Sequence, residues 1–177
     1  MPGCVRRLAI LLLACGALGG ACAAATEERQ PAVWQTRELN FDYVGFTSRY
    51  SCDGLRDRVE QALKTLGARG DLTVTPYPCS TVDRPELLPS LRIKVSTLQP
   101  AMAAAEGGTV QARWKTVRLA GANGLGPGDC ELAEQIRSRI LPLFTTRNLE
   151  ARTTCVPHQE SAGNILLTVD VLVPAAQ

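Results

Sequence analysis

Histidine is almost missing from this chain of 177 residues: the only one is His158, in the loop "VPHQESAGN". Ser161 is close in sequence, but a catalytic triad also needs an acid and an oxyanion hole. One histidine with a single nearby acid, Glu160, supplies too few ligands for a metal site. The sequence therefore predicts neither histidine-based catalysis nor a metal centre, and no motif in it implies a cofactor.

Long apolar runs are scarce too, and the only one lies at the N-terminus. Two arginines precede "LAILLLACGALGGA", which is too short to span a bilayer, and the small residues "ACAAA" follow it. This pattern predicts a signal peptide over residues 1–25. A lipid anchor on Cys15 or Cys22 is the alternative. No later run approaches membrane-spanning length, so we expect no transmembrane segment and a periplasmic or secreted product.

Net charge is missing from the predicted mature protein. The full chain has 19 Lys and Arg against 17 Asp and Glu, and residues 1–25 remove two arginines and no acid. The mature chain is therefore formally neutral. A neutral domain has no bulk attraction to nucleic acid or to an anionic membrane, so we expect no nucleic-acid partner.

Short CxxC-type cysteine pairs, which a four-cysteine metal site requires, are also lacking. Three of the seven cysteines leave with the signal peptide. The four that remain are far apart in sequence: Cys52, Cys79, Cys130 and Cys155. An even number of cysteines in an exported chain predicts two disulfides.

What the chain does contain is an internal repeat. Two segments that each carry a pair of these cysteines share an apolar pattern under a shift of 77 residues. Leu55, Val59, Leu63, Leu66 and Leu72 map to Leu132, Ile136, Ile140, Leu143 and Leu149. On the flanks, "WQTREL" parallels "WKTVRL" and "LRIKV" parallels "LTVDV". We interpret this as a duplication over nearly the whole mature chain, with repeats at residues 26–108 and 109–177.

Each repeat is predicted to be a β-α-β-β unit. Period-two alternation indicates a first strand, and apolar residues at helical spacing indicate the helix that follows. Two more strands are expected near residues 72–77 and 91–98, with counterparts near 149–154 and 165–173. In both copies a tryptophan and a later leucine have opposite phase, which suggests a bulge or bend. Ser51 and Asp129 stand at N-cap positions, and Pro142 should distort the second helix.

The fold class that follows is α+β. Two tandem repeats are predicted to form one antiparallel sheet with both helices on one face; two separate domains are the alternative. A strand that returns beneath its helix ends near the start of that helix. We therefore expect disulfides within each repeat, Cys52 with Cys79 and Cys130 with Cys155, although the other pairings stay open.

Two surfaces are candidates for function. Arg92 and Lys94 alternate with apolar residues, as do Arg113 and Lys115, so four cations could share the open face of the sheet. An ordinary solvated sheet face is the simpler interpretation, and no stacking aromatics are expected there. The loops after each second cysteine, residues 80–90 and 156–164, are the other candidate.

The leading hypothesis is an exported, non-catalytic binding or envelope-associated module. Its partner would be an unknown protein or an anionic molecule, and the module would be a monomer or a dimer. A secreted inhibitor is a variant of this hypothesis. The alternative from another class is a small secreted hydrolase-like enzyme that uses acids scattered over the chain.

Overall fold

The computed structural model describes residues 28–46, 48–77, 85, 87–102, 108–121, 124–154 and 165–175. Its elements follow the order β-α-β-β twice. The first half holds β1 (Arg29–Asp42), α1 (Cys52–Thr65), β2 (Thr73–Pro76) and β3 (Ser90–Pro100). The second half holds β4 (Val110–Arg118), α2 (Cys130–Gln135), η1 (Ile136–Ile140), η2 (Leu141–Leu143), β5 (Thr146–Thr153) and β6 (Ile165–Pro174).

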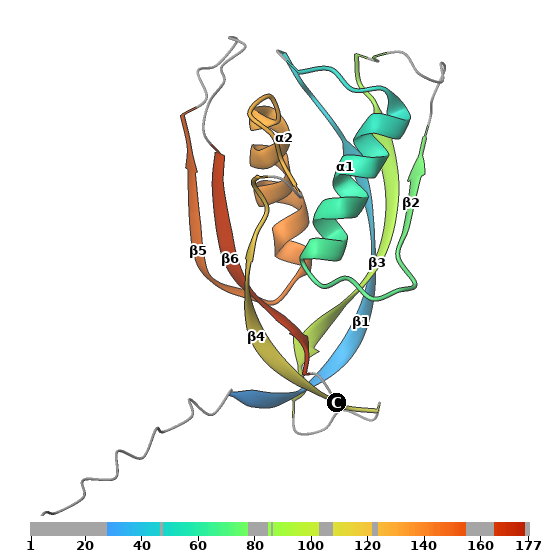
Figure 1. Cartoon of the computed structure of the whole chain (residues 1–177). Coiled ribbons are helices and arrows are strands. Elements are labelled where there is room, and N and C mark those ends of the chain that lie inside the picture. Colours follow the sequence, from blue (N-terminus) through green and yellow to red (C-terminus); the bar gives the residue numbers. More distant parts are fainter. Residues whose placement is uncertain are drawn as a thin grey trace, which may run out of the picture.

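The six strands form one antiparallel sheet in the order β2-β3-β1-β4-β6-β5. The predicted α+β fold with a single antiparallel sheet and two helices is thus confirmed. Strands β1 and β4 pair only over Arg29–Ala32 and Val110–Arg113. From this short junction the two halves of the sheet diverge, and both helices lie over the same face (Figure 1).

The main core lies between the helices and the sheet. The apolar residues predicted for the first helix, Leu55, Val59, Leu63 and Leu66, are fully buried. In the second half Leu132, Ile136 and Ile140 are also fully buried. They pack against alternate residues of the strands, such as Phe41, Ile93 and Val169. Leu149, which the repeat pattern grouped with this set, is instead 48% exposed on the edge strand β5.

A second apolar cluster lies on the outer face, which is the face of the sheet away from α1 and α2. It consists of Ala32, Leu98, Ala112 and Leu172, with Trp34, Val110 and Trp114 packed against them. The register of β1 against β3 is continuous from Ala32 to Asp42, so of the expected bulge or bend between Trp34 and Leu39, a bulge does not occur. The phases differ because Trp34 packs on the outer face while Leu39 packs towards the helices.

The two helical segments end differently. In α1, Gly67 has φ +88° and follows the last turn, a backbone conformation that favours glycine. In the second half the backbone N–H of Leu141 reaches the carbonyl of Ile136, which makes a π-helical turn directly before Pro142. Proline cannot donate a helical hydrogen bond and crowds the preceding turn, so the predicted distortion is confirmed.

The N-cap predictions had different outcomes. Ser51 caps α1, since its hydroxyl accepts a hydrogen bond from the backbone N–H of Gly54 at 3.1 Å. Asp129 also occupies the predicted N-cap position of α2, but its side chain makes no cap hydrogen bond to that helix. Its carboxylate accepts from the Tyr50 hydroxyl and from the backbone N–H of Gly126 instead.

Replacing the Ser51 cap should measurably weaken the fold. Ser51→Ala is expected to lower the free energy of unfolding by about 1 kcal/mol, because an N–H of the first turn loses its acceptor. Urea denaturation of the purified protein measures this change. Ser51→Asp is the matched control, since aspartate restores the acceptor and should return most of the loss; equal losses in both variants would contradict the cap.

Candidate functional site

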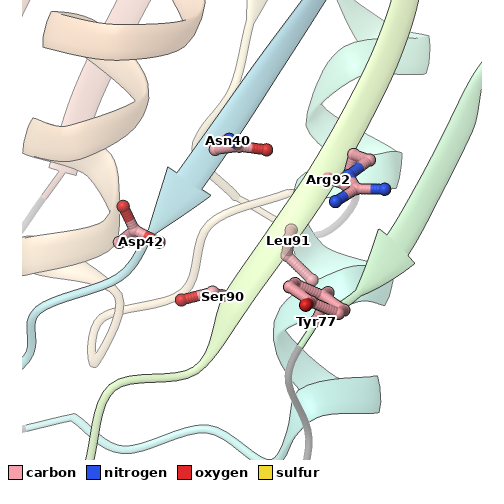
Figure 2. A pocket seen from close by; sticks show the side chains of 6 residues that line it. All are labelled: Asn40, Asp42, Tyr77, Ser90, Leu91 and Arg92. Carbon is pink, nitrogen blue, oxygen red and sulfur yellow. The ribbon is translucent and has the colours of Figure 1, made fainter.

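A small polar hollow lies on the outer face near one end of the first half. Its volume is about 230 Å³, and its lining comes from three strands or strand ends: Asn40, Asp42, Tyr77, Ser90, Leu91 and Arg92. Figure 2 shows these side chains in front of the strands, with the helices behind. The hollow thus combines a cation, a carboxylate, an amide, a hydroxyl and an aromatic ring.

The register of β1 and β3 sets this arrangement. Asn40 lies opposite Arg92, and Asp42 lies opposite Ser90. Their neighbours Phe41, Leu91 and Ile93 are buried in the main core, so alternation directs the polar set outward. Tyr77 follows β2 and donates its backbone N–H to the Ser90 carbonyl at 2.8 Å, which brings its ring to the edge of the hollow.

The two charges of the hollow have different surroundings. The Arg92 guanidinium carbon lies 5.1 Å from the centroid of the Tyr77 ring, within cation–π range. Asp42 lies 3.9 Å from Arg139 of η1, which also donates to the Asn40 and Asp42 carbonyls. Among the described residues, no acid forms an ion pair with Arg92 or with its neighbour Lys94. Within this part of the chain, the hollow therefore presents the Arg92 guanidinium without a partner acid.

The four predicted cations do not share one face. Arg92 and Lys94 alternate with Leu91, Ile93 and Val95 of the main core, so they lie on the outer face. Arg113 and Lys115 have the phase of Val117, which also belongs to the main core, and therefore lie on the helix side of the sheet. The expectation was wrong because Ala112 is buried, and Trp114 packs partly buried, on the outer face rather than under the helices.

The remaining predicted site residues are the cysteines. Cys52 and Cys130 are the first residues of α1 and α2, and both are buried. Cys79 and Cys155 lie outside the described residues, as does His158, so the disulfide pairing stays a prediction. The loop at residues 156–164 and most of the loop at residues 80–90 lie outside them too.

Aromatic side chains do occur on the outer face, contrary to expectation. Each tryptophan there has an arginine over its ring. The Arg69 guanidinium carbon lies 5.6 Å from the Trp34 ring centroid, and that of Arg147 lies 4.2 Å from the Trp114 centroid. Because this stack occurs once in each half and is part of the second apolar cluster, we interpret it as structural.

A buried polar junction joins the two halves. Asp129 is only 5% exposed, and its carboxylate accepts from the Tyr50 hydroxyl and lies 3.4 Å from Arg58. Beside it, Glu131 of α2 accepts from the backbone N–H groups of Phe46 and Ser48. The loop after β1 is thus held by side chains of the other half.

This junction suppresses tyrosine ionisation. Burial and the Asp129 carboxylate raise the pKa of Tyr50 well above its ordinary value. Burial and the nearby Glu131 raise the pKa of Tyr43 in the same way. Both tyrosines are therefore neutral hydrogen-bond donors at physiological pH, and we interpret the junction as structural rather than catalytic.

The sequence signal for the hollow was weak. Asn40 and Asp42 were recognisable as outward residues of a strand, but nothing local connected them with Ser90 or Tyr77. Among the described residues, no cluster of His, Cys, Asp and Glu side chains is suited to hold a metal ion. In the same part of the chain, no helix has the length and apolar character needed to cross a membrane.

Comparisons with known proteins add no relative. The chain matches no family model, no curated protein and no solved structure. The class of protein is therefore defined by its own fold and site: an α+β protein with one open sheet face and a polar hollow on that face.

Proposed function

We propose that this is an exported, non-catalytic binding protein whose site is the hollow on the outer face, together with Arg92 and Lys94. The signal-like N-terminus supports export to the periplasm or the medium. The observation that carries the binding function is Arg92, which forms no ion pair with any described acid and stacks on an exposed tyrosine at the hollow. Its partner would be an anionic molecule or a protein with an acidic surface.

A gene duplication is part of the proposal, and strand pairing supports it. In the first half Ala32 pairs with Pro100 and Trp34 with Leu98. In the second half the equivalent pairs are Ala112 with Pro174 and Trp114 with Leu172. The sequence repeat equates "WQTREL" with "WKTVRL", and "LQPA" at 98–101 also parallels "LVPA" at 172–175, so equivalent residues pair in both halves. Each copy would therefore be one β-α-β-β unit. We further propose one disulfide within each copy.

Comparison of the two copies helps to distinguish residues that maintain the fold from residues that bind a partner. Features that serve the fold should occur in both copies, as the arginine–tryptophan stacks do. Among the described residues, the polar lining of the hollow is not repeated in the second copy. At the positions that the sequence repeat equates with Asn40, Tyr77, Arg92 and Lys94, the second copy has Ala120, Thr153, Thr168 and Asp170. A polar set that the framework does not require is most simply explained by a ligand.

The chemistry of the lining favours recognition over catalysis. General acid–base catalysis usually needs two titratable groups tuned to different roles. The described lining holds one carboxylate, that of Asp42, whose side chain is 60% exposed and lies beside Arg139. Arg92, Asn40 and Ser90 supply hydrogen-bond donors, which suits binding of an anion.

Removing the two outer-face cations should abolish most of the binding. Hydrogen bonds to charged groups contribute about 1.5–3 kcal/mol each, so Arg92→Ala with Lys94→Ala should weaken binding by about tenfold or more. The measurement is recovery of partners from the envelope fraction and medium of the producing cells on immobilised mature protein.

The matched control is Lys115→Ala with Arg118→Ala. Both residues are exposed on β4, and their removal changes the net charge equally. This variant should recover partners as the unaltered protein does. If both double variants lose binding equally, bulk charge and not the hollow is responsible, and the proposed site is wrong.

A further inference from the structure

Exposed apolar side chains gather beside the hollow. The described part of the chain has seven large apolar side chains that are exposed, and five belong to this end of the first half. They are Val44, Phe46, Tyr77, Leu87 and Leu88, called here the apolar rim, with exposed fractions between 47% and 72%. A concentration of exposed apolar side chains of this kind commonly marks an interaction site.

Backbone contacts place the rim next to the hollow. The N–H of Tyr43 donates to the Pro89 carbonyl at 3.0 Å, so the chain that leads to Val44 runs beside Leu88. Tyr77 itself belongs to both the rim and the lining of the hollow. In Figure 1 the end of β1 and the start of β3 lie at the same end of the molecule, opposite the junction of β1 with β4. Rim and hollow therefore lie at the same end of the molecule and share Tyr77.

The rim is held in place by the other half of the protein. The backbone N–H of Val44 donates to Gln135 at 3.1 Å, and that of Phe46 donates to both carboxylate oxygens of Glu131 at 3.0 Å. The main chain is therefore fixed, while the side chains of Val44 and Phe46 remain exposed. A surface fixed before binding loses less conformational entropy when a partner docks.

We infer that the hollow and the apolar rim dock a segment of a partner protein that carries an acidic side chain next to apolar ones. This inference rests on the proposed binding function and names its class of partner. The partner's carboxylate would bind Arg92 and Lys94, and its apolar side chains would pack on Leu87, Leu88 and Phe46. Tyrosine and arginine beside exposed apolar groups are typical of the centres of protein interfaces.

The size and the charges of the surface favour a protein segment. A hollow of about 230 Å³ is smaller than the roughly 300–1,000 Å³ of most small-molecule pockets, and it suits a single side chain. Glu38 and Asp42 are exposed on the same face as Arg92 and Lys94. An anionic membrane would be repelled by these acids, whereas a protein segment can match alternating charges residue by residue.

The test is selection of short random peptides displayed on phage against the mature protein. We expect the enriched sequences to carry Asp or Glu beside aliphatic or aromatic residues. A synthetic copy of an enriched peptide should bind about tenfold or more weakly to Arg92→Glu with Lys94→Glu, and to Leu87→Ser with Leu88→Ser. Lys115→Glu with Arg118→Glu makes the same charge change away from the surface and should bind as the unaltered protein does. Circular dichroism verifies that each variant is folded.

Other occupants are outcomes of the same experiment. Enriched peptides without acids, or no enrichment, would overturn the inference. If vesicles of phosphatidylglycerol bind the protein and lose binding with Arg92→Glu and Lys94→Glu, the site takes anionic lipid and the binding function stands without the protein segment. Self-association in sedimentation that the same variant abolishes would assign the surface to a second copy. If none of these probes depends on Arg92 and Lys94, the proposed function fails as well.

Discussion

Reduction of the mature protein is expected to lower its free energy of unfolding by roughly 3 kcal/mol for each of two disulfides. Each proposed bridge, Cys52 with Cys79 and Cys130 with Cys155, closes a loop that contains a helix and the strand after it. Opening both loops restores conformational freedom to the unfolded chain, which stabilises the unfolded state. Guanidinium denaturation with and without dithiothreitol measures the loss.

Intact mass and peptide mapping provide the control for this prediction. The oxidised protein should be lighter than the reduced one by two hydrogen atoms per bridge, and proteolysis should release peptides joined within each half. Cys52→Ala with Cys79→Ala should cost about half of the full loss, because the bridge in the other half remains. Four cysteines that react with maleimide in the folded protein would contradict the predicted bridges.

Loss of the buried carboxylate at the junction is the second large effect. Asp129→Ala should destabilise the protein by about 3 kcal/mol, because the partly buried Tyr50 hydroxyl and the Gly126 N–H lose their acceptor. The ion pair with Arg58 contributes less, since that side chain is about half exposed. Chemical denaturation of the variant measures the change.

Asp57→Ala is the matched control for this substitution. Asp57 also pairs with an arginine, Arg56, at 2.9 Å, but its side chain is 67% exposed. Exposed ion pairs contribute about 0–1 kcal/mol, so this variant should be close to the unaltered protein in stability. Equal losses in the two variants would contradict a special role for the buried carboxylate.

The junction also bears on binding. Glu131, which lies next to the Asp129 cluster in α2, holds the backbone of the loop that presents Phe46. The apolar rim of the first half therefore depends on a helix of the second half. This contact links the two halves: the proposed binding surface belongs to one half, and the main chain at Val44 and Phe46 is fixed by side chains of the other.

The helices, their buried faces and the order of elements could be predicted from the sequence, because these features depend on local periodicity. The apolar residues of α1 recur at helical spacing, and the same spacing returns in the second half up to Ile140, so both helices and their buried faces were predicted. The parallel between the two halves also predicted the order of elements and a single antiparallel sheet. Pro142 predicted the distortion of the second helix, because proline lacks a backbone N–H and crowds the preceding turn.

The faces of the strands could not be assigned in this way. Alternation shows that Trp114 and Arg113 point in opposite directions, but it does not show which of them faces the helices. Trp114 packs on the outer face because Leu172 and the cluster around Trp34 lie there, contacts between residues far apart in the chain. Because Trp114 lies on the outer face, Arg113 and Lys115 lie on the helix side of the sheet, opposite to the face that carries Arg92 and Lys94.

The sequence by itself determined the helices, the strands and their order along the chain, because each follows from residues close together in the chain. Only the tertiary structure decided the site. The register of β1 with β3 and the end of β2 bring Asn40, Asp42, Ser90, Arg92 and Tyr77 together. Register is set by packing across the whole sheet, and no local pattern of residues encodes it.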